Sequence, residues 1–359
     1  MSARTPFNIQ PKRILVITLR YLGDTLLVTP LISSLKAAYP DAAIDVLLSA
    51  ANMGIFEGNP EVSQLVPMPD KSDKIGYLRL LWRLFRRYDL AIATQAGDRP
   101  VLCAVIAGKM RLGFVPENAG RHSWKRRLLD RYLEFGDHHT HAVLENLRFC
   151  ELLQITPSYA LTPPTAVAEW PLSATEKYAV LHLMPQWRYK QWGAADWIQV
   201  GRFIHNQGYT LILTGSSQAD ELAAIAKIQQ ELPGSTLNLA GRLSLAQLTG
   251  IIKKSALFVG PDTGITHLAA AVGVPVFALF GPTDPKKWGP WPFGYEKNQS
   301  PFAATGTQKI NNVCLIQGVS SNGCVPCQLE GCNRNRQSHS LCLEQLPAEI
   351  VIKYLQLAI

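Results

Sequence analysis

Short apolar runs alternate with longer amphipathic segments along most of this chain. The alternation is clearest between residues 257 and 280, where an apolar run leads through a polar loop into a segment with helical periodicity. Buried parallel strands give short apolar runs, whereas helices give longer segments with a period of about 3.6 residues. We therefore predict a strand at Leu257–Val259, a helix at Ile265–Val272 that ends at Gly273, and a strand from Pro275 to Phe280.

The same alternation fills both halves of the chain. In the first half we expect strands at Arg13–Thr18, Ile44–Leu48, Asp89–Thr94 and Met110–Phe114, with helices at Thr25–Tyr39 and His141–Leu153. In the second half we expect strands at Tyr178–Leu183, Tyr209–Thr214 and Thr236–Leu239, with helices at Asp196–Gln207, Ala219–Leu232 and Leu245–Ser255. Strands that alternate with helices build parallel sheets. The predicted fold class is α/β, with two Rossmann-like, doubly wound domains that face a cleft.

A proline-rich stretch without periodicity, Thr156–Pro171, separates the two halves. We place an N-terminal domain at residues 1–160, a linker at 161–175 and a C-terminal domain at 176–345. A final helix at residues 346–359 is expected to pack across the two domains. A chain of 359 residues is long enough for two domains of ordinary size.

The polar loop Asp262-Thr263-Gly264 lies between a strand and the start of a helix. The first N–H groups of a helix have no partner within it, and the helix dipole adds positive potential at the same end. The N–H groups of Thr263, Gly264 and Ile265 are therefore expected to form an anion site, such as a site for phosphate. The alternative is that Asp262 or Thr263 merely caps the helix and that His267 packs on it.

Composition limits the class of protein. The chain is 47% apolar and 17% charged, which is typical of a soluble globular protein. The apolar run from Leu268 to Phe280 is too short to span a membrane and is interrupted by Gly273 and Pro275. The N-terminal residues lack the apolar core of a secretion signal. We therefore expect a cytoplasmic protein.

The net charge of +8 is concentrated in one segment, Tyr77–Arg131, which contains 12 basic and 4 acidic residues. Its first part, Tyr77–Tyr88, is amphipathic: apolar residues share one helical face and Arg79, Arg83 and Arg86 share another. Such a helix can pack into the core by its apolar face and leave the basic face in water. It can also form a surface that meets anionic lipid or a phosphorylated substrate. No nucleic-acid-binding motif is present, so nucleic acid is not an expected partner.

Two common phosphate-binding motifs are missing. The chain contains neither GxxxxGK[ST] nor GxGxxG, which argues against a P-loop NTPase and against a nicotinamide or flavin dehydrogenase. No cofactor is expected. Any bound phosphate must be held by helix N-termini and point charges. Lys190, shortly after the strand Tyr178–Leu183, is the candidate charge.

Several motifs together resemble the ADP-heptose–lipopolysaccharide heptosyltransferases. They are Gly23-Asp24 after the first strand, Lys190-Gln191-Trp192, Asp262-Thr263-Gly264-Ile265-Thr266-His267 and Phe280-Gly281-Pro282-Thr283-Asp284. The likeness covers nearly the whole chain. Within the family, Leu19–Leu27 and Trp288–Trp291 are most similar to the heptosyltransferase III branch.

The resemblance implies a GT-B fold and an inverting transfer of heptose from ADP-heptose to the lipopolysaccharide inner core. Such a transfer needs a base on the acceptor side and stabilisation of a departing diphosphate opposite. By the resemblance, Asp24 is the general base, and Lys190 is both a catalytic and a donor-binding residue. The remaining donor-binding residues that it implies are Asp262, Thr263 and Gly264 at the diphosphate, His267, Leu243 at the adenine and Asp220 at the ribose. Glu221 is an equally plausible ribose contact.

The acceptor implied is a lipid A–core oligosaccharide at the cytoplasmic face of the inner membrane, where the enzyme is expected to be peripheral. Expected acceptor-binding residues are Arg20, Arg99, Arg121 and His141. The chain has no Asp-x-Asp pair, so we expect charge and helix dipole to act at the diphosphate without a metal ion.

Alternatives remain for the key residues and for the activity. Asp24 could be the N-cap residue of the helix Thr25–Tyr39, and Lys190 could be a surface charge. The chain could also be another GT-B sugar-nucleotide enzyme, such as an epimerase that uses no acceptor. A third possibility is a nucleotide-sugar-binding module without turnover.

Five of the seven cysteines follow residue 313. Cys324, Cys327, Cys332 and Cys342 have a spacing compatible with a small zinc site. Structural disulfides are not expected in the cytoplasm. The alternative is a loop of reduced thiols.

Overall fold

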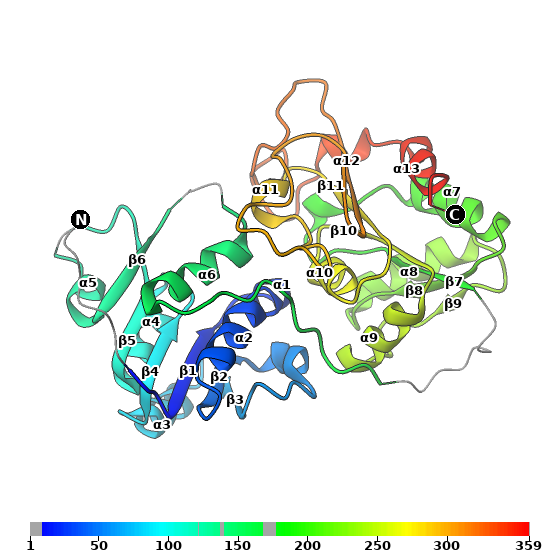
Figure 1. Ribbon diagram of the computed structural model, residues 1–359. Helices are drawn as coiled ribbons and strands as arrows, with labels where there is room; N and C mark the ends of the chain where they lie inside the picture. Colours follow the sequence, from blue (N-terminus) through cyan, green and yellow to red (C-terminus); the bar gives the residue numbers. More distant parts are fainter. Residues whose placement is uncertain (1–8, 121, 137–139, 168–176, 359) are drawn as a thin grey trace. The chain divides into compact units, whose positions relative to one another are not determined.

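The computed structural model describes residues 9–120, 122–136, 140–167 and 177–358 (Figure 1). The chain divides into two compact units, Met1–Thr162 and Pro163–Ile359. The division falls inside the predicted linker, of which residues 168–175 lie outside the described part. Each unit contains one largely parallel sheet.

Unit 1 is built on a six-stranded parallel sheet in the order β3-β2-β1-β4-β5-β6. The strands are β1 (Arg13–Thr18), β2 (Ala43–Ser49), β3 (Gln64–Met68), β4 (Tyr88–Ala93), β5 (Gly108–Pro116) and β6 (Arg131–Phe135). The helices are α1 (Leu22–Leu26), α2 (Thr29–Ala38), η1 (Ala50–Phe56), α3 (Lys74–Leu84), α4 (Asp98–Ala107), α5 (Trp124–Leu128) and α6 (Ala142–Leu153).

Helices cover both faces of this sheet. Leu15 and Ile17 of β1 belong to a core that also contains Leu80 of α3 and Val101 of α4. The alternate residues of β1 are equally buried, and they point to the opposite face because side chains alternate along a strand. On that side α2 and α6 pack against each other. Burial on both faces explains why the central strands are continuously apolar.

The prediction of one continuous helix at Thr25–Tyr39 is wrong. The segment is divided into α1 and α2, and the break falls at Leu27 and Val28. Pro30 lies in the first turn of α2, where its missing N–H costs no hydrogen bond. The same residue could not continue a helix that began before it. Apolar residues continue through the break, so the apolar period does not mark it.

Unit 2 contains a seven-stranded sheet in the order β12-β13-β11-β10-β7-β8-β9, in which only β12 is antiparallel to its neighbour. The strands are β7 (Tyr178–His182), β8 (Thr210–Thr214), β9 (Leu237–Asn238), β10 (Leu257–Pro261), β11 (Val276–Phe280), β12 (Gln308–Ile310) and β13 (Val313–Gln317). The helices are η2 (Arg188–Lys190), α7 (Ala194–Asn206), α8 (Ala219–Gln230), α9 (Leu245–Lys254), α10 (Gly264–Ala271), α11 (Pro285–Trp288), α12 (Leu341–Glu344) and α13 (Ala348–Leu355).

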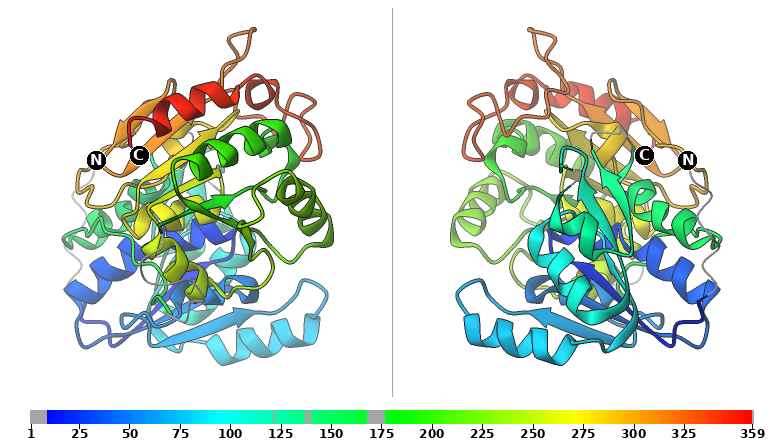
Figure 2. Two further views of the ribbon diagram at one scale, coloured as in Figure 1. Left: turned by 90° about the vertical axis from the view of Figure 1, so that its right-hand side faces the viewer. Right: turned by 90° about the vertical axis from the view of Figure 1, so that its left-hand side faces the viewer.

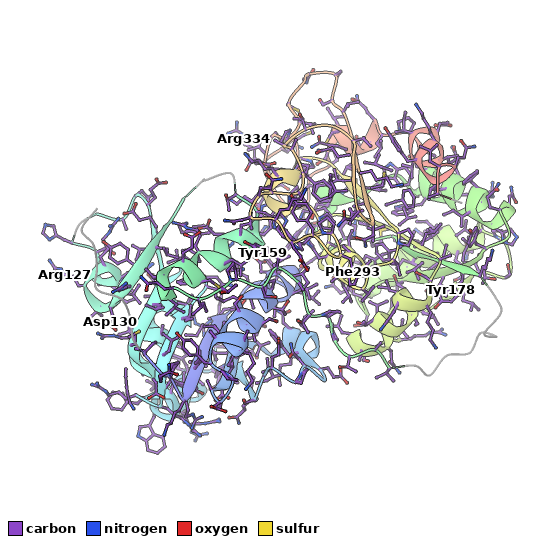
Figure 3. The ribbon with its side chains drawn as sticks, viewed as in Figure 1. Arg127, Asp130, Tyr159, Tyr178, Phe293 and Arg334 are labelled. Atoms are coloured by element: carbon purple, nitrogen blue, oxygen red, sulfur yellow. The ribbon has the colours of Figure 1, made fainter. Side chains whose placement is uncertain are left out.

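The helices of unit 2 lie around its sheet (Figure 2) and are held there by tertiary contacts. The Tyr178 hydroxyl at the start of β7, labelled in Figure 3, donates to the Ile251 carbonyl of α9 at 2.7 Å. The final helix α13 packs on α7, and the Ala348 N–H donates to Asp196 Oδ1 at 3.0 Å. The packing of this helix across both domains stays a prediction. Gly273 ends α10 with a φ of +88°, as the sequence predicted.

The first five strands of each unit have the same order in their sheets, counted from the first strand of the unit. The chain moves outward from β1 to β3 and returns to pair β4 on the other side of β1. In unit 2 it moves from β7 to β9 and returns at β10. At such a reversal the loops leave the sheet in opposite directions and open a crevice at the carboxyl ends of the strands. Each unit therefore has one favoured position for a ligand site, at β1/β4 and at β7/β10.

The amphipathic segment predicted at Tyr77–Tyr88 forms α3, which starts earlier and ends earlier than expected. Asp73 is the N-cap residue, and its Oδ1 accepts from the Gly76 N–H at 2.8 Å. The helix packs on unit 1 through Leu80 and Leu84, whereas Trp82 is exposed. Core packing by the apolar face that the sequence indicated is thus only partly right. Leu81 of that face packs beside the core, but Leu78, Trp82 and Phe85 are exposed. No helix in the described part of the chain is long and apolar enough to cross a membrane.

We predict that Asp45 stabilises unit 1 by joining three neighbouring strands. Its buried Oδ2 accepts from the Tyr88 hydroxyl at 2.8 Å and lies 3.1 Å from Arg13 Nη2. Asp45→Ala leaves a buried hydroxyl without its acceptor, and we expect a loss of roughly 2–4 kcal/mol in the free energy of unfolding. Urea unfolding measures it. Asp41→Ala, at an exposed position, is the control. Equal midpoints for the two variants would contradict the prediction.

Candidate functional site

Two charged side chains meet at the strand reversal of unit 2. Lys190 follows β7 and Asp262 follows β10, which are neighbouring strands. Lys190 Nζ lies 2.6 Å from Asp262 Oδ2, and the two side chains are 20% and 7% exposed. The alternative that Lys190 is an ordinary surface charge is therefore wrong. An ammonium fixed at this position can be offered to an anionic ligand.

Helix α10 begins two residues after Asp262. Thr263 is the N-cap residue, and its Oγ1 accepts from the Thr266 N–H at 3.3 Å. The capping role considered for Thr263 is thus confirmed. It does not remove the anion site, because the N–H groups of Gly264 and Ile265 have no possible acceptor within the helix.

His267 is buried in the first turn of α10. Burial lowers the pKa of its imidazole to about 4, with the Lys190 charge adding to the effect and Asp262 opposing it. The ring is therefore neutral at neutral pH. Its Nδ1 has no hydrogen-bond partner among the described residues. His267 thus adds no charge to the Lys190–Asp262 pair, and it packs on the helix as one alternative expected.

The cysteine-rich segment supports the loop that carries Lys190, a contact that the sequence did not reveal. The Ser340 hydroxyl donates to the Tyr189 carbonyl at 2.6 Å. The Arg336 guanidinium lies 4.6 Å from the centre of the Trp187 ring. Both contacts fix the backbone next to Lys190.

The cysteines of this segment are free thiols in the structure. Burial raises the pKa of the Cys342 thiol to about 12, and the nearby thiols of Cys327, Cys332 and Cys324 raise it too. No group of three or more His, Cys, Asp or Glu side chains is arranged to hold a metal ion in the part of the chain that the structure describes. The zinc site and its alternative, a loop of reduced thiols, both stay predictions.

Two further loops lie at the carboxyl edge of the same sheet. The Gly241 N–H donates to the Gly215 carbonyl at 3.0 Å and joins the loops after β8 and β9. Glu221 accepts from the Ser216 N–H at 2.8 Å, so its carboxylate holds the first loop. Asp220 is exposed in the first turn of α8, and Leu243 is half-buried just before α9. Of the two candidate ribose contacts, Asp220 has the more accessible carboxylate.

Asp24 lies at the strand reversal of unit 1, after β1. It is the third residue of α1, and the N-cap residue is Tyr21. The alternative that Asp24 is the N-cap residue of its helix is therefore wrong. The first turn of a helix favours the ionised form of a carboxyl group, as a base requires.

Two amide side chains hold the loop that carries Asp24, and the sequence analysis missed both. Asn52 Nδ2 is buried and donates to the Arg20 carbonyl at 2.7 Å and to Thr25 Oγ1 at 3.0 Å. Gln95, after β4, accepts from the Leu19 N–H at 3.0 Å. Their position two or three residues after the ends of β4 and β2 was the available signal, because such positions border the crevice of a doubly wound sheet.

The expected acceptor-binding residues lie at several places in unit 1. Arg20 is exposed in the loop after β1. Arg99 lies over the Tyr77 ring at 5.1 Å and lines a hollow of about 480 Å³ with Lys71, Lys74 and Leu78. His141 is buried as the N-cap residue of α6, where its Nδ1 accepts from the Val143 N–H at 3.2 Å. Arg121 lies outside the described residues. Acceptor binding by these residues stays a prediction, and the structure gives His141 a structural role.

Similarity to known proteins agrees with this geometry. Residues 78–315 match the family described as Glycosyltransferase family 9 (heptosyltransferase). Lipopolysaccharide heptosyltransferase 3 of Escherichia coli K12 is 32% identical over 290 residues, which cover 76% of this chain and 83% of that protein.

Two solved structures share the fold. The glycosyl transferase family 9 protein from Veillonella parvula has a TM-score of 0.76 at 19% identity and covers 97% of both chains. Escherichia coli ADP-heptose lps heptosyltransferase II has a TM-score of 0.72 at 20% identity, covering 96% of this chain and 98% of that one. The predicted α/β class, the GT-B fold and the resemblance to heptosyltransferases are confirmed. The chain belongs to glycosyltransferase family 9, the heptosyltransferase family.

Proposed function

We propose that this protein is an inverting glycosyltransferase that moves heptose from ADP-heptose to the inner core of lipopolysaccharide. The observation that carries the proposal is the Lys190–Asp262 ion pair beside the α10 N-terminus, at the strand reversal where a nucleotide diphosphate is expected. The names of similar proteins support the substrates, since they include lipopolysaccharide heptosyltransferase 3 and ADP-heptose lps heptosyltransferase II. The first of these supports the heptosyltransferase III branch.

Unit 2 is the proposed donor-binding part. The diphosphate of ADP-heptose accepts hydrogen bonds from the N–H groups of Gly264 and Ile265 and pairs with Lys190. Asp262 holds the ammonium in place before the donor arrives, and neutral His267 leaves that balance of charge unchanged. Leu243 and Asp220, on the loops after β9 and β8, are the proposed contacts of adenine and ribose. When the sugar–phosphate bond breaks, Lys190 and the helix dipole stabilise the negative charge on ADP.

Unit 1 is the proposed acceptor-binding part, with Asp24 as general base. The acceptor hydroxyl attacks C1 of the heptose as its proton passes to the Asp24 carboxylate. The bond from C1 to the phosphate oxygen breaks, and its electron pair leaves with ADP. Attack opposite the leaving group inverts the anomeric carbon. Arg20, Arg99, Arg121 and His141 are proposed to contact the acceptor.

The reaction is proposed to need no metal ion. Lys190 and the α10 N-terminus together supply positive charge where many nucleotide-sugar enzymes place a divalent cation. The acceptor is carried by lipid, so we propose that the enzyme works as a peripheral protein at the cytoplasmic face of the inner membrane.

The release of ADP from ADP-heptose tests the proposed function directly. It is measured with and without a truncated, soluble core oligosaccharide, and with a chelator present. Acceptor-dependent release that survives the chelator supports the proposal. Turnover of ADP-heptose without acceptor would instead fit the epimerase-like alternative, and binding without turnover would fit a nucleotide-sugar-binding module.

Replacing Asp24 by Asn is predicted to remove the base while keeping the shape of the side chain. A sugar hydroxyl is a poor nucleophile until its proton is being transferred, so the loss falls on the transition state. We expect kcat to fall by about 10²–10⁴-fold, with ADP-heptose affinity and melting temperature nearly unchanged. Steady-state kinetics, calorimetry and thermal unfolding measure these quantities. A stable variant with near-normal kcat shows that the base lies elsewhere, and Asp41→Asn controls for the loss of one carboxylate.

Replacing Lys190 by Ala is predicted to weaken ADP binding and to slow turnover. The change removes a charge-assisted contact with the diphosphate, which costs roughly 1.5–3 kcal/mol, or about 10- to 150-fold in affinity. Asp262 also loses its counter-charge and then repels the phosphates. Titration calorimetry with ADP measures the effect, with Lys254→Ala at an exposed position of α9 as the control. An affinity equal to that of the control contradicts the proposed role.

A further inference from the structure

Helix α3 presents a stripe of large apolar side chains to solvent. Ile75, Leu78, Trp82 and Phe85 are 64%, 65%, 82% and 66% exposed. They follow one another at spacings of three or four residues, so they lie on one side of the helix. We call these four residues the α3 stripe. Figure 2 shows α3 at the edge of unit 1, where one side of the helix packs on the unit and the other is open.

The stripe is not left over from core packing, because α3 already has a separate buried face. Leu80 and Leu84 are 4% and 2% exposed and fill the core of unit 1. An apolar residue exposed singly is ordinary, whereas a contiguous exposed group marks a surface that meets something apolar. The helix therefore has two apolar faces, one for the fold and one for a partner.

Basic side chains flank the α3 stripe. Lys74, Arg79 and Arg83 are exposed on α3, and no described acidic side chain forms an ion pair with them. Arg86 follows directly after the helix. Lys71, Lys74 and Arg99 also surround the hollow of about 480 Å³, which has Tyr77 and Leu78 in its wall. An apolar stripe between cations matches a partner that is apolar inside and anionic at its surface.

Other cations of the basic segment are already used within unit 1. Lys125 Nζ lies 2.8 Å from Asp98 Oδ1 and donates to the Ala96 carbonyl at 2.6 Å. Arg126 Nη2 lies 2.9 Å from Glu134 Oε1. These two residues keep the loops near β4 and β6 in place. Lys125 and Arg126 are therefore not part of the exposed, unpaired positive charge on α3 and at its ends.

We infer that α3 docks this enzyme on an anionic phospholipid bilayer. The α3 stripe enters the boundary between headgroups and acyl chains, and the flanking lysines and arginines contact lipid phosphates. Tryptophan is favoured at this depth because its ring is apolar and its N–H is polar. A second copy of the chain fits less well, because two stripes facing each other bring their flanking cations together. The inference rests on the proposed function for its biological setting, since a lipid-borne acceptor must be reached at a membrane.

Vesicle binding tests the inference with the full-length chain. The probe is vesicles of phosphatidylcholine with about one quarter phosphatidylglycerol, and cosedimentation measures the partition coefficient. The double variant Leu78→Gln/Trp82→Gln is expected to bind at least about tenfold more weakly. Val319→Gln/Leu357→Gln removes two exposed apolar side chains from unit 2 and is expected to bind as the wild type does.

The cations are tested by Arg79→Gln/Arg83→Gln. We expect the partition coefficient on the anionic vesicles to fall about tenfold or more, and this difference from the wild type to shrink in high salt. On phosphatidylcholine alone we expect little change in binding. Wild-type binding by the stripe variant overturns the inference. The inference is also overturned if the wild-type chain does not bind vesicles but self-associates through the same stripe in sedimentation experiments, because α3 is then a contact between copies.

Activity separates this inference from the proposed function. On a soluble core oligosaccharide the α3 variants are expected to keep their ADP affinity and turnover, whereas on acceptor held in vesicles their turnover falls with binding. A wild-type chain that binds vesicles through α3 but transfers no heptose to soluble acceptor refutes the proposed function and leaves the docking surface standing. If the wild type and all α3 variants transfer heptose equally well to acceptor held in vesicles, the docking surface alone is refuted.

Discussion

The reversal of strand order in each sheet is the constraint on which both candidate sites depend. A parallel sheet has both faces covered by helices, so the loops at the carboxyl ends of its strands are where polar groups can gather around a ligand. Loops on neighbouring strands normally crowd each other, but at β1/β4 and β7/β10 they diverge. Asp24 follows the first of these reversals, and Lys190 and Asp262 border the second. Their position is thus a consequence of topology before it is a matter of chemistry.

The Lys190–Asp262 ion pair carries a cost of desolvation. The Asp262 side chain is only 7% exposed, and it costs free energy to remove a carboxylate from water. An ion pair recovers that free energy only when its geometry is good. The contacts of Ser340 with Tyr189 and of Arg336 with Trp187 keep the lysine in that geometry. The pair therefore holds the Lys190 ammonium in a fixed and partly desolvated place, where the diphosphate of the proposed donor would compete with Asp262 for it. An ammonium free in water would have to be ordered first, which weakens binding.

Local pattern was enough for part of this structure. β1 has the predicted bounds, and the motif from Asp262 to His267 was placed correctly at a strand end and helix start, because both depend on neighbours in sequence. What depends on distant partners was not predictable. The break between α1 and α2 leaves the apolar period intact, and periodicity cannot say which face of α3 meets the core. Asn52 and Gln95 become visible only once the topology brings them to the loop of Asp24.

The two faces of α3 show where folding and function impose different demands on one helix. The core contacts of α3 come from Leu80 and Leu84, with Tyr77 and Leu81 packed beside them. Polar residues at positions 78, 82 and 85 would keep these contacts and make unit 1 more soluble. An exposed tryptophan flanked by unpaired cations brings a risk of aggregation that the fold does not need. Charge limits that risk, since equal patches repel one another while an anionic surface attracts them. The arginines that make two such patches repel each other are also suited to draw the α3 stripe to an anionic bilayer.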